Sequence, residues 1–118
     1  MARYVDGFLL AVPRRKLAAY KAMAAKAGKV WREHGALEFV ESVIDDVPNS
    51  FGVPFPKAAK TKPGEVVVFS FIVYKSRAHR DAVNKKVMAD PRLQSAPAAM
   101  PFDHTRMSWG GFKTLVDL

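Results

Sequence analysis

EVVVFSFIVY, residues 65–74, is the stretch of the sequence that decides the fold. It is rich in β-branched and aromatic residues, which predicts a β-strand. Both faces of this strand are mainly apolar, since one carries Val67, Phe69, Phe71 and Val73 and the other carries Val66, Val68 and Ile72. A strand with two apolar faces is typical of the centre of a sheet that is covered on both sides. Its polar exceptions are Ser70 and Tyr74.

The spacing of apolar residues predicts three more strands and two helices around this stretch. The strands are expected at residues 3–12, 36–47 and 105–116, and the helices at residues 14–34 and about 76–89. The long stretch from Val47 to Gly64 is irregular, with one expected helical turn at Pro56–Lys60. The pair Gly110-Gly111 indicates a bulge or a close backbone approach in the last strand.

The order strand–helix–strand–strand–helix–strand predicts an α+β protein with a ferredoxin-like βαββαβ fold. Right-handed crossovers place both helices on one face of the antiparallel sheet, with the first and third strands in its middle. We expect one domain over residues 1–118. Two helices leave the other face bare, and a bare apolar face of several hundred Å² is more than monomers usually expose. A second copy is the commonest cover, so the sequence predicts a homodimer whose sheets face each other as a dimeric α/β barrel.

Composition limits the classes of function. The sequence has no cysteine, which excludes disulfides, thiolate metal sites and cysteine nucleophiles. Its start does not read as a signal peptide and its apolar runs are too short to cross a membrane, so we expect a cytoplasmic protein. The net charge is +8, but residues 36–56 hold four acidic residues and no Lys or Arg. Such a distribution can attract an anionic partner or bring oppositely charged parts of neighbouring subunits together.

Several stretches resemble a known family. They are Tyr4–Phe8, Glu33–Glu38, Val68–Arg77, Asp81–Met88, Pro101–Asp103 and Arg106–Phe112. Together they cover nearly the whole chain and resemble the YbaA-like family of small bacterial proteins, within the superfamily of dimeric α/β barrels. The resemblance implies the barrel fold and the homodimer. Superfamily relatives include cofactor-free monooxygenases, haem-degrading enzymes and dismutase-like proteins, but the resemblance implies no catalytic residues.

Candidate site residues come from the polar groups that the fold can bring to the barrel. If the even-numbered face of residues 65–74 looks into the barrel, Ser70 and Tyr74 line a cavity there, joined by Asp6, Arg106 and Trp109. A carboxylate beside a guanidinium would orient a polar substrate. The alternative is a structural salt bridge at the rim of the barrel, because ion pairs also serve stability.

The three histidines offer little chemistry. His104, beside an acidic neighbour, is the best candidate for a proton carrier, so the catalytic candidates are Asp6, Tyr74, His104 and Arg106. His34 is interpreted as favourable to the end of the first helix, and His79 as a packed or surface residue. Their spacing predicts no metal site, and the absence of GxGxxG, P-loop and similar motifs predicts no cofactor.

Two hypotheses of function follow. The first is a small-molecule binding barrel, with a cofactor-free oxygenase as the nearest enzyme class and with enzyme activity left open. The second is a non-enzymatic dimeric module that binds an acidic partner or RNA through the basic helix at residues 14–34. Nucleic acid is the less favoured partner, because the cations are not interleaved with glycine or aromatic residues in one tract.

Overall fold

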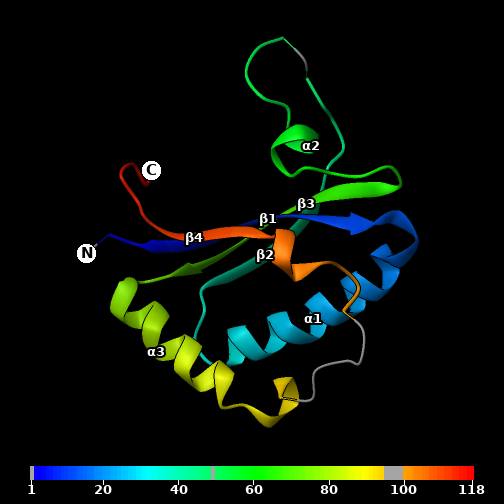
Figure 1. Ribbon diagram of the computed structural model, residues 1–118. Coiled ribbons are helices and arrows are strands. Elements are labelled where there is room, and N and C mark those ends of the chain that lie inside the picture. The colour runs from blue at the N-terminus through cyan, green and yellow to red at the C-terminus, as the bar shows by residue number, and fades with distance from the viewer. Residues whose placement is uncertain (1, 49, 95–99) are drawn as a thin grey trace.

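Four β-strands and three α-helices alternate along the chain in the computed structural model, which describes residues 2–48, 50–94 and 100–118 (Figure 1). The strands are β1 (Tyr4–Pro13), β2 (Glu38–Val43), β3 (Glu65–Tyr74) and β4 (Ser108–Lys113). The helices are α1 (Leu17–Glu33), α2 (Phe55–Ala58) and α3 (Arg77–Met88), with 3-10 turns at η1 (Arg14–Lys16), η2 (Pro91–Leu93) and η3 (His104–Arg106). The protein is therefore an α+β protein, as predicted.

The sheet is antiparallel throughout, with the strand order β2-β3-β1-β4. Its two central strands, β1 and β3, are the longest and most apolar, and they pair along their whole length, from Tyr4 opposite Tyr74 to Pro13 opposite Glu65. The prediction that residues 65–74 form a central strand is confirmed. The shorter and more polar strands β2 and β4 form the edges.

Helices α1 and α3 lie against one face of the sheet (Figure 1). The even-numbered residues of β1 and β3 pack against them and form the core. One cluster joins Ile72 and Tyr74 to Val83 and Val87 of α3, and another joins Leu10 and Val68 to α1. Ser70 and Tyr74 therefore lie on the side of the sheet that faces the helices, and not on the opposite side, which a barrel between two sheets would enclose.

The ends of several elements differ from the predicted ones for local reasons. Helix α1 starts at Leu17, after a 3-10 turn that follows Pro13. The last strand starts only at Ser108, because the Asp103 carboxylate accepts a hydrogen bond from the Thr105 backbone N–H at 3.0 Å and caps a turn there. The predicted start of α3 is confirmed, since the hydroxyl of Ser76 accepts a hydrogen bond from the backbone N–H of His79 and caps the helix.

The close approach predicted at Gly110-Gly111 is confirmed at its second residue. The ring of Tyr4 lies over Gly111 so tightly that a Cβ there would overlap the ring, whereas a Cβ on Gly110 would stay 3.9 Å from Phe112. The register of β1 and β4 continues without interruption through the pair. The glycine thus lets an aromatic core residue cover the backbone of the edge strand.

The other face of the sheet is only partly covered. Helix α2 and the stretch after β4 lie on this side (Figure 1). The ring of Phe55 in α2 packs 6.1 Å from that of Phe69, yet Phe69 is still 46% exposed and Phe112 is 61% exposed. We call this surface the open face.

Candidate functional site

A cavity of about 330 Å³ lies between the helix-facing side of the sheet and helices α1 and α3. Its walls are mostly apolar and aromatic and include Phe8, Leu10, Met23, Trp31, Phe39, Phe102, Met107 and Trp109. Five residues with polar groups join them, namely Asp6, Tyr20, Glu41, Ser70 and Asn84. A mostly apolar cavity with a few convergent polar groups is typical of a small-molecule site.

Asp6 brings a carboxylate to this cavity and pairs it with Arg80 of α3. Nη1 of Arg80 donates a hydrogen bond to Oδ1 of Asp6 at 2.8 Å, and both side chains are largely buried. The same guanidinium lies 4.9 Å from the centre of the Tyr4 ring. Burial raises the pKa of the Asp6 carboxyl, and Arg80 opposes this effect by favouring the charged form. The expected contact between Asp6 and Arg106 is replaced by this pair.

Sequence reasoning missed Arg80, although a signal was present. Arg80 falls in register with the buried Val83 and Val87 of α3 at steps of three and four residues. A cation on the apolar stripe of a helix, opposite a strand that carries a single carboxylate, indicates a buried ion pair.

A second carboxyl, that of Glu41, is held by Tyr20. The hydroxyl of Tyr20 on α1 donates a hydrogen bond to Oε1 of Glu41 on β2 at 2.7 Å. Glu41 as a whole is exposed on its edge strand, but the hydrogen bond between its carboxyl and Tyr20 is partly buried. Burial therefore raises the pKa of both groups, and the neighbouring Ser70 favours the charged form of Glu41.

Tyr74, at the end of β3, has a packing role. Tyr74 is fully buried, and its hydroxyl donates to Oδ1 of Asn84 at 3.2 Å. Nε1 of Trp31 donates to both of them, at 3.1 Å to the Tyr74 hydroxyl and 3.2 Å to Asn84. Burial raises the pKa of Tyr74. Asn84 carries this network to the wall of the cavity.

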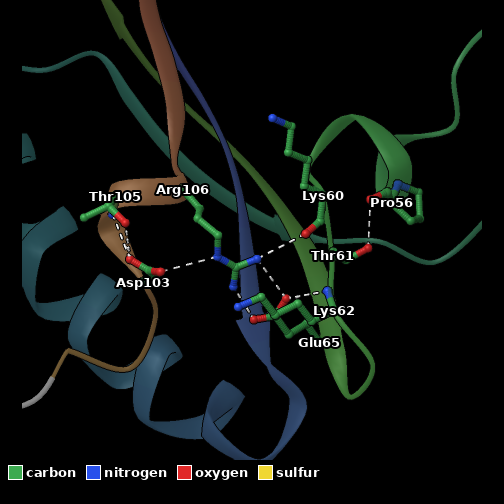
Figure 2. A network of polar contacts seen from close by, with 8 residues as sticks. All are labelled: Pro56, Lys60, Thr61, Lys62, Glu65, Asp103, Thr105 and Arg106. Carbon is green, nitrogen blue, oxygen red and sulfur yellow. Dashed lines mark hydrogen bonds and ion pairs between the residues drawn. The ribbon is translucent and has the colours of Figure 1, made fainter.

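Of the other candidates, Ser70 and Trp109 line the cavity and Arg106 does not lie among its walls. Ser70 is buried, whereas Trp109 is 63% exposed and stacks on Phe8 with ring centres 6.4 Å apart. The guanidinium of Arg106 binds the chain's own acceptors: both carboxylate oxygens of Glu65, and the carbonyl oxygen of Lys60 at 3.1 Å (Figure 2). Its Nε lies 3.4 Å from Oδ2 of Asp103.

The histidines lie elsewhere. His104 is exposed in η3. His34 ends α1, as predicted, and its Nε2 lies 2.8 Å from Oδ2 of Asp90. Nδ1 of His79 accepts a hydrogen bond from the Lys75 backbone N–H at 2.9 Å. Within the ranges that the structure describes, no cluster of side chains is suited to hold a metal ion, and no helix is long and apolar enough to cross a membrane.

A wider groove of about 1010 Å³ runs outside the cavity, between α1 and the edge strand β2. Leu17, Lys21, Lys29 and Arg32 of α1 line it, and the groove shares Tyr20, Ala24, Phe39, Val40 and Glu41 with the cavity. Tyr20 and Glu41 are the hydrogen-bonded pair of this common wall. A molecule that enters the cavity from the groove would pass them.

Comparisons with known proteins agree with the resemblance to the YbaA-like family. The model of a family described as "Protein of unknown function (DUF1428)" matches residues 3–104. The chain is 48% identical over 115 residues to the "Uncharacterized protein YbaA" of Escherichia coli (strain K12), covering 98% of each chain. It has the same identity and coverage with the YbaA protein of Shigella flexneri.

Proposed function

Because the chain belongs to the DUF1428 family, whose function is unknown, we propose a function from the geometry of its own site. The protein binds a small, largely aromatic molecule with a hydroxyl group in the cavity between the sheet and the helices. The observation that carries this proposal is the convergence of Asp6, Ser70 and Asn84 on an otherwise apolar cavity. Such polar groups orient a ligand while the apolar walls supply affinity.

The size and lining of the cavity define the class of ligand. Its volume of about 330 Å³ lies at the low end for small-molecule sites. Phe8, Phe39 and Trp109 offer ring faces and edges to an aromatic ligand. Asp6 and Ser70 offer hydrogen-bond acceptors to its hydroxyl. A phenol or a naphthol has both properties.

A second candidate function is proton transfer from the bound ligand. Burial raises the pKa of both Asp6 and Glu41, which brings two carboxyls closer to neutral pH beside one cavity. A carboxylate of this kind is a stronger base toward an acidic hydroxyl or carbon acid. This observation is compatible with a cofactor-free oxygenase-like enzyme, whose chemistry would start from a deprotonated substrate.

The finer description of the fold belongs to the same proposal. The strand order β2-β3-β1-β4, with α1 and α3 on one face, supports a ferredoxin-like unit. The exposed Phe69 and Phe112 on the open face support a homodimer that stacks sheet on sheet as a dimeric α/β barrel. The alternative, an acidic partner or RNA on the basic helix, has only the exposed cations of α1 in its favour.

The binding proposal is tested by filling the cavity. Titration of the protein with 2-naphthol, followed by calorimetry, should show binding to the wild type. Ala27→Phe places a ring on the cavity wall and should weaken binding at least about tenfold. Ala22→Phe adds the same ring to an exposed position of the same helix and should bind as the wild type does. Equal binding by both variants, or no binding of phenols and naphthols by the wild type, would contradict the proposal.

A further inference from the structure

An acidic, apolar arm projects from the body of the molecule. We define the arm as residues 44–48 and 50–54, which connect β2 to α2. It rises on the side of the sheet that α1 and α3 leave open (Figure 1). Phe51 is 92% exposed and Val53 is 67% exposed. Large apolar side chains exposed on a projecting segment indicate a surface that is covered by another chain.

Both feet of the arm are tied to the sheet. At the first foot, the backbone N–H of Ile44 donates to the carbonyl of Val67 at 2.9 Å, one residue beyond the end of β2. At the second foot, Phe55 packs on Phe69 of the open face. The arm is thus anchored to the sheet at both of its ends.

Arg106 fixes the second foot further. Its guanidinium joins Glu65, at the start of β3, to the carbonyl oxygen of Lys60 just after α2 (Figure 2). Lys60 has a φ of 53°, a left-handed conformation that a residue other than glycine adopts only at a cost. The hydroxyl of Thr61 donates to the carbonyl of Pro56 at 2.8 Å and closes the turn. These contacts stabilise one position of α2, from which the arm departs.

The open face by itself is small for a stable dimer. Strands about 4.8 Å apart with a rise of roughly 3.3 Å per residue give a four-stranded sheet of this length a flat outline of roughly 500 Å², to which the relief of its side chains adds. A stable interface buries about 800 Å² of accessible surface on each partner, so the open face alone would have to be buried almost completely. Helix α2 already covers part of the face. A second copy stacked on the open face would also lie alongside the arm, which stands on the same side and can supply the missing area.

Charge favours a second copy as the partner of the arm. The segment 36–56, which contains the arm, holds Glu38, Glu41, Asp45 and Asp46, and all 19 Lys and Arg lie elsewhere in the chain. Lys57 in α2 and Lys60 just after it are exposed on the open side of the sheet, so a second copy stacked there offers cations to Asp45 and Asp46. We propose that each arm reaches across the open face onto the other copy, burying Phe51 and Val53 there. This inference rests on the homodimer of the proposed function.

Sedimentation of the full chain over a range of concentrations tests the inference. The wild type should dimerise, and Phe51→Ser combined with Val53→Ser should raise the dimer dissociation constant at least about tenfold. The unfolding midpoint of the double variant, measured at a concentration where only monomer is present, should match that of the monomeric wild type. A dimeric wild type whose dissociation constant does not change in the double variant would overturn the arm and leave the dimer standing.

Charge reversal supplies a matched control. Asp45→Lys with Asp46→Lys should weaken the dimer and remove part of its salt dependence. Glu33→Lys with Asp81→Lys changes the net charge equally on the helix side of the molecule, where both side chains are more than half exposed. Equal weakening by both pairs would overturn the specific contact of the arm. A wild type that stays monomeric at every soluble concentration would overturn the dimer and the arm together.

Discussion

Arg80 donates a hydrogen bond to the buried carboxylate of Asp6 at 2.8 Å and so joins α3 to a central strand at the wall of the cavity. A buried ion pair adds little to stability relative to apolar residues, but the loss of one partner leaves a charge without compensation. The pair therefore links the stability of the fold to the electrostatics of the cavity.

Arg80→Met should lower the free energy of unfolding by about 3 kcal/mol, because it leaves the Asp6 carboxylate buried without its partner. The double variant Asp6→Asn with Arg80→Met should lose less unfolding free energy than the two single variants lose in sum. Urea denaturation of the four proteins at neutral pH measures this coupling. Additive effects would show that the two groups do not interact in solution.

The loss of unfolding free energy in Arg80→Met should also depend on pH, in a direction that the pKa of Asp6 determines. In the wild type the pKa of Asp6 is higher in the folded state than in the unfolded state. The protonated carboxyl therefore contributes stability in acid, and this contribution is lost as the pH rises from the unfolded pKa of about 3.8 through the folded pKa. Without Arg80 the pKa of Asp6 should rise further. The destabilisation of Arg80→Met should therefore shrink as the pH falls, and a constant difference in unfolding free energy between pH 4 and pH 7 would contradict this reading.

Gly111→Ala should destabilise the protein by about 1–3 kcal/mol, because the new Cβ overlaps the ring of Tyr4. Gly110→Ala is a matched control on the adjacent residue, where the Cβ meets Phe112 at an ordinary contact distance of 3.9 Å. Thermal unfolding should separate the two variants clearly. Similar midpoints would mean that Tyr4 moves aside easily.

Tyr20→Phe should raise the pKa of the Glu41 carboxyl further, since it removes a hydrogen bond that favours the charged form. Titration of the Glu41 side chain by carbon-detected NMR measures the change. Tyr74→Phe removes a hydroxyl that bonds to Asn84 and should leave the titration of Glu41 as it is in the wild type. An unchanged Glu41 titration in Tyr20→Phe would argue against this hydrogen bond.

The lowered pKa of the Asp90 carboxyl should make the protein less stable in acid. Hydrogen bonds from Arg92 and then His34 lower the pKa of its carboxyl. The stability from this group is complete above the unfolded pKa of about 3.8 and is lost as the pH falls toward the lower folded value. Asp90→Asn should flatten the fall of the thermal midpoint below pH 4, and a fall as steep as in the wild type would contradict this role of Asp90.

Much of the fold could be predicted because it depends on local patterns. The apolar character of residues 65–74 is enough to place them in the sheet centre, and Ser76 is enough to start α3. The faces of β3 were harder, because both are apolar. Only the packing of Ile72 and Val68 against helices distinguishes the covered face from the open one.

The partners of charged residues could not be predicted, because they depend on strand register. Asp6 lies opposite Gly111 in β4, so the chain before this strand runs toward the far end of β1. Arg106 is carried along with it and meets Glu65, which pairs with Pro13 at that end. A shift of register changes such partners while it leaves the pattern of apolar residues intact.

The pairing of β1 with β4 sets the order in which the molecule can be completed. Tyr4 lies opposite Lys113, so two residues that are far apart along the sequence are neighbours in the sheet. During synthesis the edge of β1 that faces away from β3 stays unpaired until β4 has left the ribosome. Contacts so distant along the chain are formed slowly. The sheet is therefore finished only when β4 is available, and a truncation before residue 108 would leave β1 as an unprotected edge that invites aggregation.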